Sequence, residues 1–168
     1  MHPISFILSP EILSLPQIMN ALQCSFLGIA TFTDDQLLHL KAKKISFDCI
    51  NITDDGINQF IKNWVCGKSV FDFKSLLLWS SQERDQSIIT RGLEIRPWDD
   101  DFRKEARGFC DDFDRCCGSG LLFQISRQID PFESLTLCIS DDCTSIYATG
   151  KRMTRGGKTY TNYSIPSH

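Results

Sequence analysis

Hydrophobic and polar residues near the start of the chain follow two different periods in turn. Residues 4–8 (Ile-Ser-Phe-Ile-Leu) form a short apolar stretch typical of a strand. Ser14 then stands where an N-cap would stand, with Pro16 in the first helical turn. The apolar residues that follow are spaced like one face of a helix: Leu15, Ile18, Met19 and Leu22. This pattern predicts a strand followed by a helix.

The strand-then-helix unit recurs over residues 24–40. Residues 24–32 are rich in apolar and β-branched residues, which favour a strand. Thr33, followed by two aspartates, is typical of a helix start, and three leucines follow it: Leu37, Leu38 and Leu40.

A third unit contains the clearest helix of the sequence. Residues 44–50 predict a strand with three apolar residues on one face: Ile45, Phe47 and Cys49. Thr53 and the two aspartates after it predict a helix start, because a hydroxyl cap and negative charge both stabilise a helix N-terminus. The helix then carries one apolar stripe, formed by Ile57, Phe60, Ile61, Trp64 and Val65. Gly67 supplies a left-handed stop.

A fourth unit follows, with a strand over residues 73–79 and a short helix over residues 85–91 that ends at Gly92. The apolar parts of the predicted strands start near Ile4, Phe26, Ile45 and Phe73, which are 22, 19 and 28 residues apart. These spacings overlap the 20–29-residue period of leucine-rich repeats. We therefore expect an α/β fold, an irregular leucine-rich-repeat-like solenoid of strands and helices with a parallel sheet. An ordinary doubly wound α/β domain is the alternative that the same alternation permits.

The second half of the chain does not continue the strand-then-helix pattern of the first half. Residues 97–115 are polar and predict a solvated loop. Three later segments predict short antiparallel strands that finish the fold: residues 121–126, 135–140 and 145–149. We expect one domain over residues 1–153, followed by a frayed tail over residues 154–168.

Composition limits the class of protein. The chain has 168 residues, of which 42% are hydrophobic and 23% charged, so it is expected to fold as a globular domain. Its net charge of -3 gives no basic field for a nucleic acid or an anionic membrane. No apolar run is long enough to span a bilayer, and no secretory signal is recognised. We expect a cytoplasmic or nuclear protein with neither nucleic-acid nor membrane partners.

The eight cysteines are candidates for a metal site or a reactive thiol, but the sequence gives only weak support for such a site. Three of them lie in apolar stretches and are expected to be small core residues: Cys24, Cys49 and Cys138. A zinc site could be drawn from the C-terminal set, Cys110, Cys116, Cys117, Cys138 and Cys143, but no C-x-x-C pair is present. A thiol- or zinc-dependent enzyme using this cluster is therefore kept as an alternative function.

Other catalytic patterns are missing from the sequence. His39 is the one histidine away from the chain ends, and its place on a short helix favours a structural role over a catalytic one. The three aspartates at 99–101 lack the spacing of a calcium loop, and neither glycine-rich phosphate motif occurs. The basic cluster of the tail is expected to be solvated: Lys151, Arg152, Arg155 and Lys158. We predict no catalytic residue, no metal site and no cofactor.

The central helix carries a specific resemblance. Residues 37–49 (Leu-Leu-His-Leu-Lys-Ala-Lys-Lys-Ile-Ser-Phe-Asp-Cys) and the helix from Ile52 to Gly67 resemble the type-2 F-box-associated domain of Caenorhabditis nematodes. The family's helix motif is matched by Asn58, Phe60, Lys62, Trp64 and Gly67. Residues 123–127 resemble the family's C-terminal strand, so the similar region covers about residues 35–140.

The resemblance implies a non-catalytic module for protein–protein interaction, which in full-length relatives holds a protein for ubiquitination by a ligase. Its protein target is unknown. The family's F-box, which docks the adaptor Skp1, is not recognised in this sequence beyond a short match over residues 10–13. We therefore expect no Skp1 binding by this chain alone. A fragment without a separate role is a further alternative.

Overall fold

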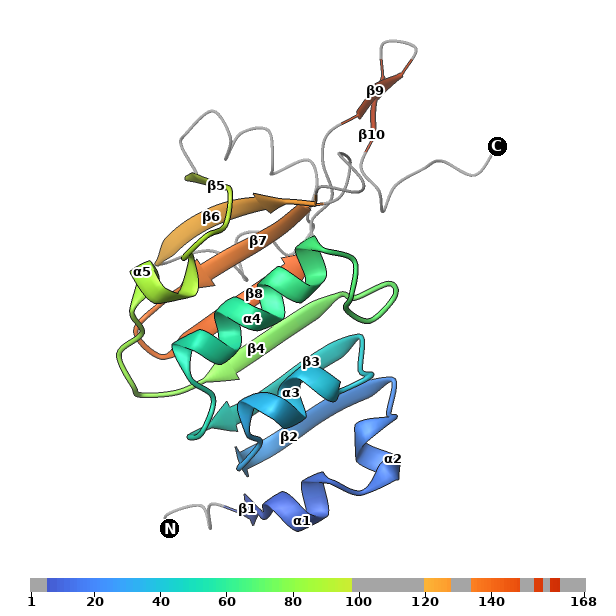
Figure 1. Ribbon diagram of the computed structural model, residues 1–168, viewed down its shortest axis with the longest axis vertical. Coiled ribbons are helices and arrows are strands. Elements are labelled where there is room, and N and C mark those ends of the chain that lie inside the picture. Colours follow the sequence, from blue (N-terminus) through green and yellow to red (C-terminus); the bar gives the residue numbers. More distant parts are fainter. Residues whose placement is uncertain (1–5, 98–119, 128–133, 149–152, 156–157, 161–168) are drawn as a thin grey trace.

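The computed structural model describes residues 6–97, 120–127, 134–148, 153–155 and 158–160. Its centre is one eight-stranded mixed sheet with the strand order β1-β2-β3-β4-β8-β7-β6-β5 (Figure 1). In chain order the elements of this part are β1 (Ile7–Leu8), α1 (Pro10–Leu13), α2 (Pro16–Met19), β2 (Gln23–Ala30), α3 (Asp34–His39), β3 (Lys44–Cys49), α4 (Asp54–Val65), β4 (Ser75–Trp79), α5 (Gln86–Ile89), β5 (Ile95–Pro97), β6 (Leu121–Ser126), β7 (Ser134–Ile139) and β8 (Cys143–Ala148).

The first half of the sheet is parallel. β1, β2, β3 and β4 pair in the order in which they occur in the chain, as the alternating periods predicted. Helices α3, α4 and α5 lie on one face of this sheet (Figure 1). A doubly wound domain would place helices on both faces and reverse the strand order at a switch point. Neither feature is seen among the described elements.

The second half of the sheet is antiparallel, as predicted for the end of the chain. β8 pairs with β4, from Trp79 against Cys143 to Ser75 against Tyr147. β7, β6 and β5 continue the sheet outward. Because β8 joins directly to the parallel strands, the two halves form one mixed sheet. The leucine-rich-repeat-like solenoid is therefore not confirmed.

The helix starts predicted around Thr33 and Thr53 are confirmed. The Thr33 hydroxyl accepts a hydrogen bond from the backbone N–H of Gln36, whose side chain accepts one from the Thr33 backbone in return. Thr53 accepts from the backbone N–H of Gly56 at 3.0 Å. These caps satisfy backbone donors that have no partner within the helix.

The predicted helix after Ser14 is present, but it is shorter than expected and Ser14 does not cap it. Ser14 instead ends α1, where its hydroxyl donates to the Pro10 carbonyl at 2.8 Å, and α2 begins at Pro16. Leu22 lies beyond α2 and is 74% exposed, so it does not extend an apolar face. Two prolines six residues apart divide the segment into two one-turn helices, because each proline suits a first turn.

The core lies between the helices and the sheet. The predicted stripe of α4 contributes Ile57, Phe60, Ile61 and Trp64, all buried, and β3 contributes Ile45, Phe47 and Cys49. The ring centroids of Phe32 and Phe47 lie 4.9 Å apart, and those of Phe60 and Phe73 lie 5.4 Å apart. Cys24 and Cys138 are also buried, as expected for small core residues.

Other sequence predictions fall partly outside the described residues. Residues 98–119, which include most of the predicted polar loop and its aspartates, lie there. In the terminal segment, β9 (Met153–Arg155) and β10 (Lys158–Tyr160) form an antiparallel pair, and fraying of the rest stays a prediction. β5 was not predicted. Within the described ranges, every helix is too short or too polar to cross a bilayer.

Candidate protein-binding surface around helix α4

Asn58 of the α4 motif connects two helices. Its side chain is buried, and its amide nitrogen donates to the carbonyls of Ile89 at 2.8 Å and Arg91 at 3.0 Å. These carbonyls lie at and just after the end of α5, where no helical donor is available. Asn58 thus holds the end of α5 against α4.

Three other motif residues shape the end of α4. Phe60 packs edge-on against Phe73, and Trp64 is 3% exposed. Gly67 has a φ of 72°, a left-handed conformation that costs glycine little, so the chain turns sharply there. Asn58, Phe60, Trp64 and Gly67 therefore specify the fold.

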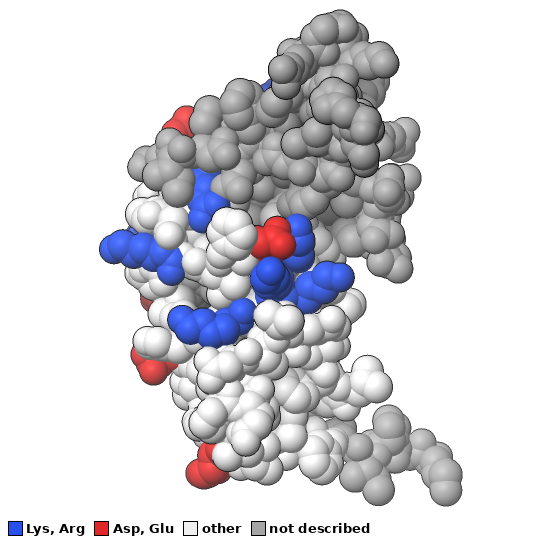
Figure 2. All heavy atoms as spheres, turned by 90° about the vertical axis from the view of Figure 1, so that its right-hand side faces the viewer, with Lys and Arg blue, Asp and Glu red and all other residues white. Residues whose placement is uncertain are grey.

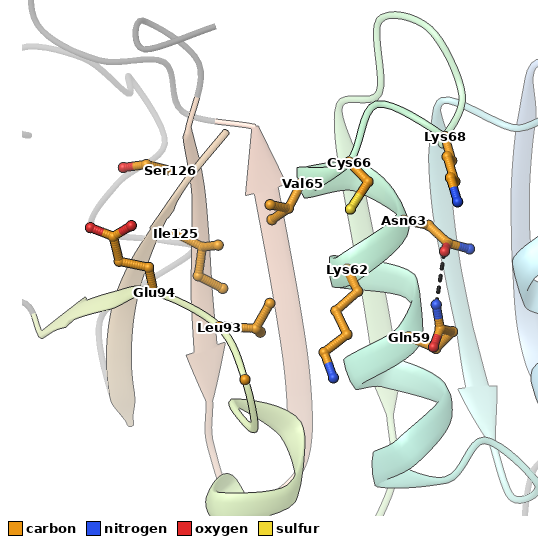
Figure 3. Close-up of a pocket in the computed structure, with 11 residues that line it drawn as sticks. Gln59, Lys62, Asn63, Val65, Cys66, Lys68, Leu93, Glu94, Ile125 and Ser126 are labelled. Atoms are coloured by element: carbon orange, nitrogen blue, oxygen red, sulfur yellow. Dashed lines mark hydrogen bonds between the residues drawn. The ribbon is translucent and has the colours of Figure 1, made fainter. Parts of the chain in front are cut away.

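Lys62 is the motif residue placed to contact a ligand, because it lines a cleft of about 350 Å³ beside α4. In Figure 3 its side chain lies in the gap between α4 and the segment that carries Leu93 and Glu94. Gly92 lies beside it with a left-handed φ of 71°, and a Cβ there would be in ordinary van der Waals contact, 3.5 Å from the Lys62 Nζ.

The cleft combines apolar walls with polar groups at its rim (Figure 3). Leu93 and Ile125 form part of its wall, and Gln59, Asn63, Cys66, Lys68, Glu94 and Ser126 line it as well. The amide of Gln59 donates to Asn63 at 2.9 Å, which orders the polar side of α4. Polar groups around an apolar wall are suited to recognition of a peptide or a side chain.

A lysine surface lies next to this cleft, at the end of the molecule where α4 stops. We define the lysine surface as Lys41, Lys43, Lys44, Lys68 and Lys74. Residues 40–45 and 66–75 contain these five lysines and a single acidic residue, Asp72. Figure 2 shows basic side chains gathered around a small acidic group on this face. Lys68 lines the α4 cleft too, so the two features adjoin.

Four of the described cysteines are buried, whereas Cys66, which lines the α4 cleft, is exposed. Cys49 and Cys143 are buried, and burial raises the pKa of both thiols, which disfavours the nucleophilic thiolate. Cys138 is buried as well, whereas Cys110, Cys116 and Cys117 lie outside the described residues. Among the residues that can be described, no three His, Cys, Asp or Glu side chains are grouped to hold a metal.

The described charged groups far from α4's end have structural partners. His39 is exposed on α3, with its Nδ1 2.7 Å from the Asp35 carbonyl. Arg84 is almost fully buried, donates to the Ile52 carbonyl at 2.7 Å and pairs with Asp54 at 3.2 Å. Arg84 therefore ties the β4–α5 connection to the start of α4.

Sequence reasoning missed the lysine surface. It placed basic charge in the tail, where Lys151 and Arg152 lie outside the described residues. The run from Lys41 to Lys44 was visible, but Lys68 and Lys74 are more than twenty residues away in sequence. Only the parallel pairing of β3 with β4 brings these segments to the same end of the sheet.

Comparison with known proteins supports the sequence resemblance. Residues 14–70 match the F-box associated family. A Caenorhabditis elegans protein described as an uncharacterized F-box protein is 45% identical over 162 residues, which cover 96% of this chain. The chain spans 42% of the length of that relative. No solved structure matches. The resemblance to the nematode family is confirmed, and the family match begins earlier than residue 35, the predicted start of the similar region.

Proposed function

Since residues 14–70 match the F-box associated family, we propose that this chain is a non-catalytic module for protein–protein interaction, similar to the substrate-recruiting part of F-box proteins in ubiquitin ligases. The Caenorhabditis elegans relative is described as an F-box protein, and 96% of this chain aligns with it. The family match includes all of α4, and the α4 cleft is the observation that supports binding at this place.

The residues that line the α4 cleft suit protein binding better than catalysis. The α4 cleft has both apolar walls and polar groups, but its described titratable side chains are lysines, an exposed cysteine and Glu94 without a histidine. General acid–base catalysis needs a group whose pKa is matched to the working pH, and such groups are commonly paired and partly desolvated. We propose a cytoplasmic or nuclear location, where F-box proteins would meet their substrates.

Skp1 docking is a separate property from substrate binding. An F-box would need helices over the first part of the chain, whereas residues 7–8 and 23–30 are strands of the sheet. We therefore propose that this chain alone binds its protein target and does not bind Skp1.

Affinity purification tests the binding function. The full chain is immobilised, nematode lysate is passed over it with and without excess free chain, and proteins displaced by the free chain are identified by mass spectrometry. Each is then produced and titrated against the chain by calorimetry. We expect saturable one-to-one binding, weakened at least about tenfold by Cys66→Glu, which adds a charge to the cleft.

Gln82→Glu is the matched control, because Gln82 is exposed on the β4–α5 connection and the charge change is the same. Equal loss with both variants would place the contact elsewhere, and absence of any saturable partner would contradict a binding role. Stoichiometric zinc in the purified chain, measured by elemental analysis, would favour the thiol or zinc enzyme instead.

A further inference from the structure

The loop between α4 and β4 presents an aromatic side chain in the middle of the lysine surface. Phe71 is 89% exposed, more than any other large apolar side chain of the described residues except Leu27. Its neighbour Asp72 has a φ of 61°, so the backbone turns through a left-handed conformation there. A local turn of this kind directs Phe71 away from the core.

Two lysines hold this turn in place. Lys74 contacts the Asp72 carboxylate at 2.6 Å and Lys43 contacts it at 3.5 Å. The hydrogen bond from Lys74, with the attraction of both ammonium groups, lowers the pKa of Asp72, so the carboxylate stays charged. The loop also connects to β3, because the backbone N–H groups of Lys74 and Ser75 donate to the Lys43 carbonyl. Phe71 is thus presented by an anchored loop.

A small pocket with both apolar and polar lining residues lies beside the loop. It measures about 80 Å³, and its lining includes Leu38, Leu40, Val70 and Phe73. Lys41 and Lys68 line the same pocket, from the α3 side and the α4 side. Ligand sites for small molecules generally measure about 300–1,000 Å³, so this pocket fits a single side chain better than a metabolite.

The two segments that contribute the lysine surface carry mainly positive charge. Five lysines and one aspartate give residues 40–45 and 66–75 together a net charge of +4, in a chain whose net charge is -3. Such a local excess attracts an acidic segment and fixes its orientation, even when the rest of the protein is negative. Apolar anchors surrounded by charge are typical of the energetic centre of a protein interface.

We propose that the lysine surface binds an acidic segment of a partner protein, with one apolar side chain of that segment in the pocket between Lys41 and Lys68 and with Phe71 packed against it. This proposal rests on the proposed protein-binding function and adds the location of the contact and the chemistry of the partner.

A protein segment fits this surface better than a nucleic acid. Nucleic-acid-binding domains are generally basic overall, with basic stripes that follow a long backbone, whereas this chain has a sequence pI near 5.6. The apolar part of the pocket lining, which includes Leu38, Leu40, Val70 and Phe73, suits an apolar side chain, and a protein segment supplies such a side chain next to its acidic groups.

Fluorescence anisotropy tests the proposal with the full chain. The probe is a fluorescein-labelled peptide of glutamate, aspartate and serine around one leucine. Its comparison probes are a peptide with glutamine and asparagine in place of the acids and a single-stranded oligonucleotide of equal charge. We expect micromolar binding of the acidic peptide that weakens as salt is raised, because exposed charges are screened.

Two surface variants separate charge from apolar contact. Lys41→Glu with Lys68→Glu is expected to weaken binding of the acidic peptide at least about tenfold, while Lys41→Arg with Lys68→Arg retains binding. Phe71→Ser is expected to weaken it about threefold to tenfold. Ile50→Ser is the matched control, because Ile50 is 48% exposed and follows β3 at the end opposite Lys44. Circular dichroism checks that each variant is folded.

Several outcomes would overturn the proposal: no binding of the acidic peptide, equal binding of the neutral peptide, tighter binding of the oligonucleotide, or no effect of the glutamate pair. The protein target found by affinity purification distinguishes failure of the lysine-surface proposal from failure of the proposed binding function. A target that binds the wild type and the glutamate pair equally overturns the lysine surface and leaves the binding function standing, whereas absence of any target overturns the function itself.

Discussion

The guanidinium of Arg127 lies over the indole ring of Trp64, 4.7 Å from the ring centroid, and its Nε donates to the carbonyl of Trp64 at 3.0 Å. Trp64 belongs to the last turn of α4, and Arg127 follows β6 from the antiparallel half of the sheet. One arginine therefore covers the aromatic ring and satisfies a carbonyl at the helix end, which joins the two sequence segments that carry the family resemblance.

Arg127→Lys is expected to lower the free energy of unfolding by about 1–2 kcal/mol, because an ammonium group cannot replace the planar stacking together with the Nε hydrogen bond. Trp64→Ala is expected to cost about 3–5 kcal/mol, as for other large-to-small core changes. Urea denaturation of the two single variants and the double variant measures their coupling. Purely additive effects would show that the stacking contributes nothing.

Asn58→Ala is expected to destabilise the protein by about 2–3 kcal/mol, because two buried carbonyls after α5 lose their donor. Hydrogen exchange is expected to accelerate in α5 before the rest of the protein. Asn63→Ala is the matched control: the Asn63 side chain accepts a hydrogen bond from Gln59 on the exposed side of the same helix, and a change within about 0.5 kcal/mol is expected. A larger effect at Asn63 than at Asn58 would contradict this assignment.

Gly56→Ala is expected to destabilise α4 by about 1–3 kcal/mol, although alanine usually favours a helix. The Asp34 carboxylate accepts from the Thr53 backbone at 2.9 Å and from its hydroxyl at 2.6 Å, and it occupies the space that a Cβ at position 56 would need. Thermal denaturation of Gly56→Ala in the wild type and in an Asp34→Ala background tests this. The penalty should disappear in the second background; if it persists, the carboxylate is not its cause.

The β1 end of the sheet is expected to promote self-association. β1 is the terminal strand of the sheet order, and apolar side chains near it are exposed: Phe6, Ile7, Leu22 and Leu27. An open strand edge with apolar neighbours is a site for pairing between chains. Sedimentation velocity should show a concentration-dependent shift that Ile7→Lys reduces. A clean monomer at all concentrations, with weak binding of a hydrophobic dye, would contradict the prediction.

Purified Skp1 is expected not to bind this chain in a pull-down, with a complete F-box protein as the positive control. Leu13 of the short F-box-like match is fully buried, so it is already used by the fold and is unavailable as an anchor. Micromolar or tighter binding would show that an F-box remnant was dismissed, provided that it is lost in Ile12→Asp. Ile12 is the appropriate position because its side chain is 44% exposed.

Features that depend on neighbours in sequence were predictable from the sequence. The caps at Thr33 and Thr53, the stripe of α4 and the buried face of β3 follow from spacing alone, because helical and strand periods place residues a few positions apart on the same side. For the segment after Ser14, the spacing predicted a helix with Pro16 in its first turn, which is confirmed, but it did not show that this helix ends after one turn at Met19.

Tertiary structure decided the features that join distant segments. The pairing of β4 with β8, the contact of Arg127 with Trp64, the α4 cleft and the lysine surface all connect residues that no local pattern relates. The sequence by itself determined which residues are buried in the main helix and strands and to which family the motif is similar. It could not determine where the exposed charges meet, because a charged side chain in water is compatible with many folds and only the packing of the sheet selects one.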